Sequence, residues 1–144
     1  MATAACFLLT YPLFWKPSSV AMASTGHQSR GWIEGDEEIV YQRCRSCEHV
    51  WYFRRTFCPK CGVQEPETRI SSGRGSVYAR TVVHRAPSES LRSHAPYLIV
   101  MVDADEGFRL MAHGEPGLVI GDRVRARFID FDDGRIPRFE KADQ

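Results

Sequence analysis

Apolar and β-branched residues recur along the second half of the chain in runs that have the length of β-strands. Five runs are expected to be strands, and they cover residues 76–85, 97–102, 108–113, 123–129 and 136–139. Turn-forming residues separate them, as in the Asp-Ala-Asp-Glu-Gly sequence at 103–107. The fourth run alternates strictly, so Val124, Ala126 and Phe128 are expected to face a core while three arginines face solvent.

The chain is therefore predicted to be mainly β. No helical periodicity of useful length follows residue 40, and the polar segment 87–96 is expected to be a loop. Five strands within about 75 residues favour a five-stranded closed barrel of the OB type. Upstream, the apolar run at 50–53 is expected to be a strand of a second, smaller unit. The apolar positions of segment 32–40 are expected to pack on that unit as a short helix or strand.

Four of the five cysteines form two Cys-x-x-Cys pairs, Cys44 with Cys47 and Cys58 with Cys61. Each pair can fold as a tight turn whose two sulfurs face one point, and two such turns supply the four tetrahedral thiolates that zinc prefers. Zn²⁺ is the expected cofactor. Its role is expected to be structural, because four thiolates leave no coordination site open for catalysis. Two disulfides, redox iron or a redox dithiol are the alternatives that the spacing leaves open.

The residues that follow the two pairs differ. Gly62 comes directly after the second pair and suits the left-handed backbone of such a turn, whereas Glu48 occupies the same place after the first pair.

Composition narrows the function classes further. The 144 residues include 19 Lys and Arg against 18 Asp and Glu, for a net charge of +1. This balance excludes a strongly basic protein that coats nucleic acid and an acidic disordered tail. No stretch approaches the roughly 18–20 uninterrupted apolar residues that span a bilayer, so no membrane association is expected. Because a zinc ribbon needs reduced thiols, a cytoplasmic location is expected.

Changes in composition divide the chain into three parts. Residues 1–30 are expected to be a disordered extension or a mis-called start. Residues 31–66 are expected to hold an N-terminal arm and the zinc ribbon. Residues 67–144 are expected to form the barrel, because Pro66 and the Ser-Ser-Gly-Arg-Gly sequence at 71–75 mark a boundary.

Seven short sequence motifs lie in a fixed order at residues 41–47, 57–62, 72–78, 81–87, 95–97, 121–124 and 137–139. This ordered series resembles the DUF35 family, which combines a rubredoxin-like zinc ribbon with an acyl-CoA-associated OB-fold. The resemblance covers residues 32–140, with Trp32 and the acids after it in the place of the family's N-terminal arm. Glu48 stands where the family's first turn commonly has Gly.

The resemblance implies a function that composition does not show. Such proteins resemble non-catalytic partners of thiolase-superfamily enzymes, among them thiolases, sterol side-chain aldolases and acyltransferases. The implied assembly is a heterotetramer of two plus two chains, in which this chain supports the enzyme and helps to hold the CoA thioester. The chain is not expected to be an enzyme on its own.

Arginine and aromatic residues are the candidates for contacts with CoA or with the partner, because forked guanidinium groups bind phosphates and exposed aromatics anchor interfaces. They are Arg74, Arg80, His84, Arg85 and Arg109 on the barrel, and Trp51, Tyr52 and Phe53 on the ribbon. Arg74 lies between two glycines, where backbone amides can also approach an anion. For the three aromatics, a place in the ribbon core is the alternative. No catalytic residue is expected, since His84 and His113 have no sequence-adjacent nucleophile.

Two other functions compete with an accessory subunit. A module that binds single-stranded nucleic acid is one, because zinc ribbons and OB barrels both bind single strands through aromatics and cations. Nucleic acid is not the expected partner, however, because the net charge is +1 and the sequence shows no broad basic face. The other is a free-standing acyl-CoA binder or small enzyme.

Overall fold

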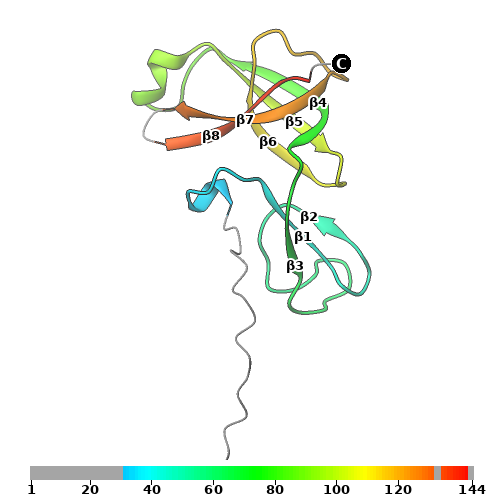
Figure 1. The fold of residues 1–144 in the computed structure, drawn as a ribbon. Coiled ribbons are helices and arrows are strands. Elements are labelled where there is room, and N and C mark those ends of the chain that lie inside the picture. Colours follow the sequence, from blue (N-terminus) through cyan, green and yellow to red (C-terminus); the bar gives the residue numbers. More distant parts are fainter. Residues whose placement is uncertain (1–30, 132–133, 143–144) are drawn as a thin grey trace, which may run out of the picture.

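Two β-sheets make up the part of the chain that the computed structural model describes, residues 31–131 and 134–142 (Figure 1). A three-stranded sheet precedes a closed five-stranded barrel. Within these residues the helices are two short 3-10 turns, η1 (Trp32–Glu34) and η2 (Ser90–His94). The expectation of a disordered extension or a mis-called start at residues 1–30 lies outside the described residues, and so does the fifth cysteine, Cys6. No described helix has the length and apolar character needed to cross a membrane.

The small sheet is built around β1 (Val40–Arg43), with β2 (Val50–Trp51) on one side and β3 (Glu67–Ile70) on the other, both antiparallel. The strand expected at 50–53 is thus confined to its first two residues. Gln42 on β1 is buried, and both polar atoms of its side chain are hydrogen-bonded. Its Oε1 accepts from Trp51 Nε1 at 2.9 Å and from the Arg55 amide at 2.6 Å, and its Nε2 donates to the Arg55 carbonyl at 3.1 Å. A satisfied buried amide of this kind fixes the ribbon backbone.

The barrel confirms the mainly β, OB-type expectation. Its strands are β4 (Arg74–Val83), β5 (Tyr97–Ala104), β6 (Arg109–Gly114), β7 (Arg123–Phe131) and β8 (Gly134–Lys141). They close in the order β4-β5-β6-β8-β7, with β7 returning to β4. All neighbours are antiparallel except β6 and β8, which are parallel. The loop expected at 87–96 contains the short turn η2.

Apolar side chains fill the barrel interior in the alternation that the sequence indicates. Val124 is fully buried, and Ala126 and Phe128 are half-buried against the same core. Gly75 marks a place where backbones come close. A β-carbon there would lie 2.3 Å from the carbonyl oxygen of Asp103 on β5. Any larger residue would push β4 away from β5, because an atom cannot approach a carbonyl that closely.

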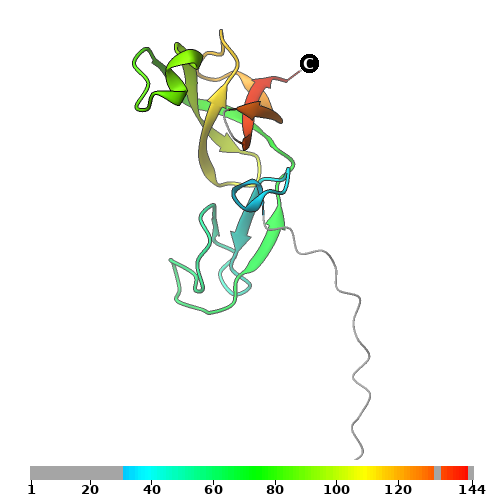
Figure 2. The ribbon, with the colours of Figure 1, turned by 90° about the vertical axis from the view of Figure 1, so that its left-hand side faces the viewer.

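The ribbon lies at one end of the barrel, and the chain passes from β3 directly into β4 (Figures 1 and 2). Phe108 of the barrel is the centre of this joint. Its ring stacks with Tyr41 at 5.1 Å and with Tyr52 at 5.7 Å between centroids. The arm adds a hydrogen bond, because Trp32 Nε1 donates to the Tyr52 hydroxyl at 2.7 Å. The arm, the ribbon and the barrel therefore share one buried cluster, which includes Ile39 of the arm.

Candidate metal centre and binding surfaces

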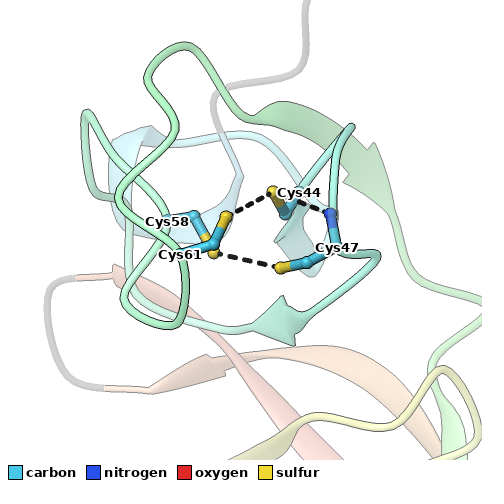
Figure 3. Close-up of side chains that lie close together, drawn as sticks. All are labelled: Cys44, Cys47, Cys58 and Cys61. Atoms are coloured by element: carbon cyan, nitrogen blue, oxygen red, sulfur yellow. Dashed lines mark hydrogen bonds between the residues drawn. The ribbon is translucent and has the colours of Figure 1, made fainter.

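The four paired cysteines converge between the two turns of the ribbon (Figure 3). Their sulfur atoms all lie within 4.8 Å of one another, and all four are free thiols. The two turns have matching backbones. The Glu48 amide donates to the Cys44 carbonyl at 3.1 Å, and the Gly62 amide donates to the Cys58 carbonyl at 2.9 Å. A set of four converging sulfurs is the donor set of a structural zinc site.

Backbone amides favour the thiolate form at the first cysteine of each turn. At Cys44 the Cys47 amide is the largest influence, and together with the Ser46 amide it lowers the pKa to about 6. At Cys58 burial opposes ionisation, but the amides of Cys61 and Lys60 outweigh it and lower the pKa. Negative charge on these sulfurs is what a divalent cation at the centre would neutralise.

The opposite holds at Cys61. The Val63 amide favours its thiolate, but the three neighbouring cysteines and burial outweigh that amide and raise the pKa of Cys61 to about 12. Four thiolates cannot coexist at this spacing without a cation. Metal binding must therefore displace protons, and acidification must release the metal.

The three aromatic candidates have different environments. Trp51 is buried against Cys44 and Cys58 and belongs to the ribbon core. Tyr52 belongs to the joint with the barrel. Phe53 is 70% exposed and, with Ile33 at 67%, borders an apolar groove of about 170 Å³. The groove is lined by Gly31, Trp32, Ile33, Glu34, Val40, Tyr52, Phe53 and Arg54.

Two of the candidate arginines are engaged within the barrel. Arg109 forms two hydrogen bonds to Asp103, at 2.5 and 2.9 Å, and its guanidinium carbon lies 3.3 Å from the centroid of the Tyr78 ring. The Asp103 hydrogen bond raises the pKa of Arg109, and the pKa of Asp103 is lowered in return. Arg80 donates to the Leu118 carbonyl at 2.5 Å. These contacts stabilise the barrel.

The remaining candidates lie at opposite ends of β4. His84 and Arg85 are exposed just after the strand, while Arg74 begins it, roughly 30 Å away along an extended chain. The structure therefore does not bring the five barrel candidates into one site. The amides beside Arg74 already have acceptors. The Gly73 amide donates to Ser71 Oγ at 3.1 Å, and the Arg74 amide donates to Ser72 Oγ at 3.3 Å.

Arg74 instead shares a cleft with residues that lie far from it in the sequence. The cleft is lined by Arg74, Glu115, Arg125, Arg127, Glu140, Lys141 and Ala142. The strict alternation of residues 123–129 was the available signal, because it placed three arginines on the outer face of one strand.

The fold and the cysteine cluster define a protein with a zinc ribbon and an OB barrel, and comparison with known families agrees. The model described as "ChsH2, rubredoxin-like zinc ribbon domain" matches residues 32–67, and "ChsH2, C-terminal OB-fold domain" matches residues 69–128. A DUF35 domain-containing scaffold protein of Methanocaldococcus jannaschii is 36% identical over 107 residues, which is 68% of this chain and 75% of the relative. A scaffold protein of the same description from Methanothermobacter thermautotrophicus is 26% identical over 95 residues, covering 62% and 71%.

Solved structures show the same architecture. A chain of an "Ltp2-ChsH2(DUF35) aldolase" superimposes with a TM-score of 0.64 at 29% identity, covering 74% of this chain and 86% of that one. A DUF35 protein from Sulfolobus solfataricus superimposes with a TM-score of 0.50 at 16% identity, covering 73% and 76%, which shows the fold alone. This chain belongs to the DUF35 family, and its ribbon holds a structural zinc ion.

Proposed function

We propose that this chain is an accessory subunit, with no catalytic residue of its own, that binds a thiolase-superfamily enzyme. Three findings support this proposal. The chain is a member of the DUF35 family, its relatives are named scaffold proteins, and a similar chain forms part of an Ltp2-ChsH2(DUF35) aldolase. The finer parts of the proposal are an assembly of two plus two chains, contact with the CoA thioester of the partner, and a cytoplasmic location.

The apolar groove between the arm and the ribbon carries the proposal. Ile33 and Phe53 expose most of their side chains there, on a backbone fixed by η1 and by the metal-binding turns. Rigid exposed aromatics beside a groove are typical interface anchors, because they bury a large apolar area at low entropic cost. Burial recovers roughly 25 cal/mol for each Å² of apolar surface removed from water.

The barrel surface also favours a protein partner over nucleic acid. Oligonucleotide-binding OB folds use the second and third strands of the barrel, which here are β5 and β6. On their outer face Met101 lies opposite Met111, which is 63% exposed, and both line an apolar depression together with Ile99. The nearby Arg109 is paired with Asp103. Single strands need stacked aromatics and free cations, whereas the centre of this face offers aliphatic side chains, and its aromatic pair, Tyr97 and His113, stacks on itself at 5.1 Å between ring centroids.

Co-purification tests the proposal. The chain is tagged in its native host and isolated gently, the bound proteins are identified by mass spectrometry, and zinc is assayed. We expect a thiolase-superfamily protein in near-equimolar amount, and light scattering of the complex gives the stoichiometry. Recovery of the zinc-loaded chain without a protein partner, or with bound RNA, would refute the proposal.

Two surface variants locate the interface. Ile33→Ser combined with Phe53→Ser removes the apolar anchors, and we expect the yield of partner to fall at least tenfold. Ile120→Ser is the matched control, because Ile120 is 66% exposed but lies in the loop before β7. Equal loss of partner in the control would place the interface elsewhere.

A further inference from the structure

A basic cleft of about 500 Å³ lies on the outer surface of the barrel, and residues of the strands β4, β7 and β8 and of the segments that follow β6 and β8 line it. Its lining carries four cations and two carboxylates, a net charge of two positive. The volume falls within the range of small-molecule sites, about 300–1,000 Å³. The acids belong to Glu115 and Glu140, and the cations to Arg74, Arg125, Arg127 and Lys141.

Two of the four cations that line this cleft already have an acidic partner. Arg127 pairs with Glu140 at 2.8 Å, and Lys141 pairs with Asp122 at 3.1 Å. Glu140 is further occupied by Arg138, which donates to its other oxygen at 2.7 Å. Glu140 is the register partner of Arg125 on β8, and its carboxylate is therefore committed to two other arginines.

Arg74 and Arg125 are the exception. They are direct partners in the register between β4 and β7, so their side chains leave the sheet on the same face. Both are exposed, and within residues 31–131 and 134–142 neither forms an ion pair. Asp105 acts on Arg74 only at longer range, since its own hydrogen bonds are to Arg123. Two like charges placed directly opposite one another destabilise a sheet unless an anion lies between them.

We propose that Arg74 and Arg125 form a binding site for the phosphate groups of a small molecule. A phosphate ester or diphosphate carries enough negative charge at one centre to neutralise both guanidinium groups, and its oxygens can accept from both forks. A single carboxylate from a protein partner neutralises only one of them. Glu115 and Glu140 at the rim disfavour a broad acidic surface, because they would repel it.

This site concerns one part of the proposed function, contact with the CoA thioester. The proposal rests on the proposed function only in that CoA is chosen as a probe. The test uses the isolated, zinc-loaded full chain and needs no partner enzyme. Its outcome and the outcome of the co-purification are thus independent.

Isothermal titration at low ionic strength is the experiment. Pyrophosphate and CoA are the phosphate probes, pantetheine is the phosphate-free counterpart of CoA, and citrate is the carboxylate probe. Single-stranded oligonucleotide tests a polymeric source of phosphate. We expect pyrophosphate and CoA to bind, pantetheine not to bind, and citrate to bind at least tenfold more weakly than pyrophosphate.

Variants assign the binding to the two arginines. Arg74→Gln combined with Arg125→Gln is expected to weaken pyrophosphate binding at least tenfold, and Arg125→Gln alone to weaken it severalfold. Arg92→Gln is the control of equal charge change, because Arg92 is exposed and paired with Glu89 at 2.7 Å. It is expected to bind within twofold of the unmodified chain.

Thermal melting of each variant provides a second readout. Because the two arginines repel each other, we expect the melting temperature of Arg125→Gln without ligand to equal or exceed that of the unmodified chain. Pyrophosphate is expected to raise it by similar amounts in the unmodified chain and in Arg92→Gln, and by less in Arg125→Gln and in the double variant. The proposal is overturned by absence of pyrophosphate binding at millimolar concentration, by equal weakening in Arg92→Gln, or by tighter binding of oligonucleotide or citrate.

Discussion

Glu48 occupies a backbone conformation that is strained for any residue with a β-carbon. Its φ is 58°, and the equivalent residue of the second turn, Gly62, has a φ of 76°. Both amides close the same type of turn by donating to the carbonyl of the first cysteine of the pair. Both turns thus require a left-handed backbone conformation at this position, and only the second turn has a glycine there. We predict that Glu48→Gly stabilises the ribbon.

Three contributions determine the expected change in the free energy of unfolding of Glu48→Gly. Relief of left-handed strain favours glycine by about 1–2 kcal/mol. The greater freedom of glycine in the unfolded chain opposes this by about 0.4–1 kcal/mol. The variant also loses the ion pair between Arg43 and Glu48, which is largely exposed and contributes a few tenths of a kcal/mol, roughly. A net gain of about 0.5 kcal/mol is expected, or about 1–2 °C in melting temperature for a chain of this length.

Glu48→Ala is the matched control, because it removes the same ion pair and keeps the β-carbon. The free energy of unfolding of Glu48→Gly should exceed that of Glu48→Ala by about 0.5–1 kcal/mol. Chelator competition gives an independent measure, since the zinc affinity of Glu48→Gly should be about two- to fivefold higher than that of Glu48→Ala. If the alanine variant is as stable as the glycine variant and binds zinc as tightly, the strain argument is wrong.

Three further predictions concern the metal, the joint and the barrel. A chelator should open the ribbon and shift Trp51 fluorescence to longer wavelength, and added zinc should reverse the shift. Phe108→Ala should lower the free energy of unfolding by about 3 kcal/mol or more, measured by urea denaturation, because Tyr41 and Tyr52 lose the ring between them. Burial and the nearby His94 lower the pKa of His113, so its protonation is resisted in the folded state. Its contribution should be complete above the unfolded pKa of about 6.5 and be lost as pH falls below it. Between pH 7.5 and pH 5.5 the melting temperature should therefore fall less steeply in His113→Phe than in the unmodified chain.

Much of the architecture could be predicted from the sequence because each element carries a local signal. The doubled Cys-x-x-Cys spacing predicts the ribbon, and the alternation around Val124 predicts a barrel strand with the correct inward face. The small sheet was harder to predict from the sequence. β1 and β3 are short and contain charged, half-buried residues such as Glu67 and Arg69. They become strands because the metal-binding turns bring them together. The local sequence pattern does not predict such a pairing.

Which side chains pair on the binding surfaces depends on strand register. Register is determined by the whole fold and not by any one segment of the sequence. Arg109 looked like a free cation, yet it lies directly opposite Asp103 across the β5–β6 hairpin and pairs with it. Arg74 and Arg125 are far apart in the chain and become neighbours only when β7 closes the barrel onto β4. Residue type and strand membership could be predicted in both cases, but the pairing could not.

The zinc ion and the proposed interface are physically linked. The buried cluster of the ribbon itself consists of Cys44, Trp51 and Cys58, which is too little apolar surface to hold three short strands without a metal. The metal-binding turns therefore supply the rigidity that apolar packing supplies in the barrel. Phe53 lies two residues after the end of the ribbon strand that carries Trp51, and its position beside Ile33 depends on that strand being formed. In this arrangement the apolar groove forms only when the zinc ion is bound, although the zinc ion performs no chemistry. Partner binding should therefore be lost together with the metal.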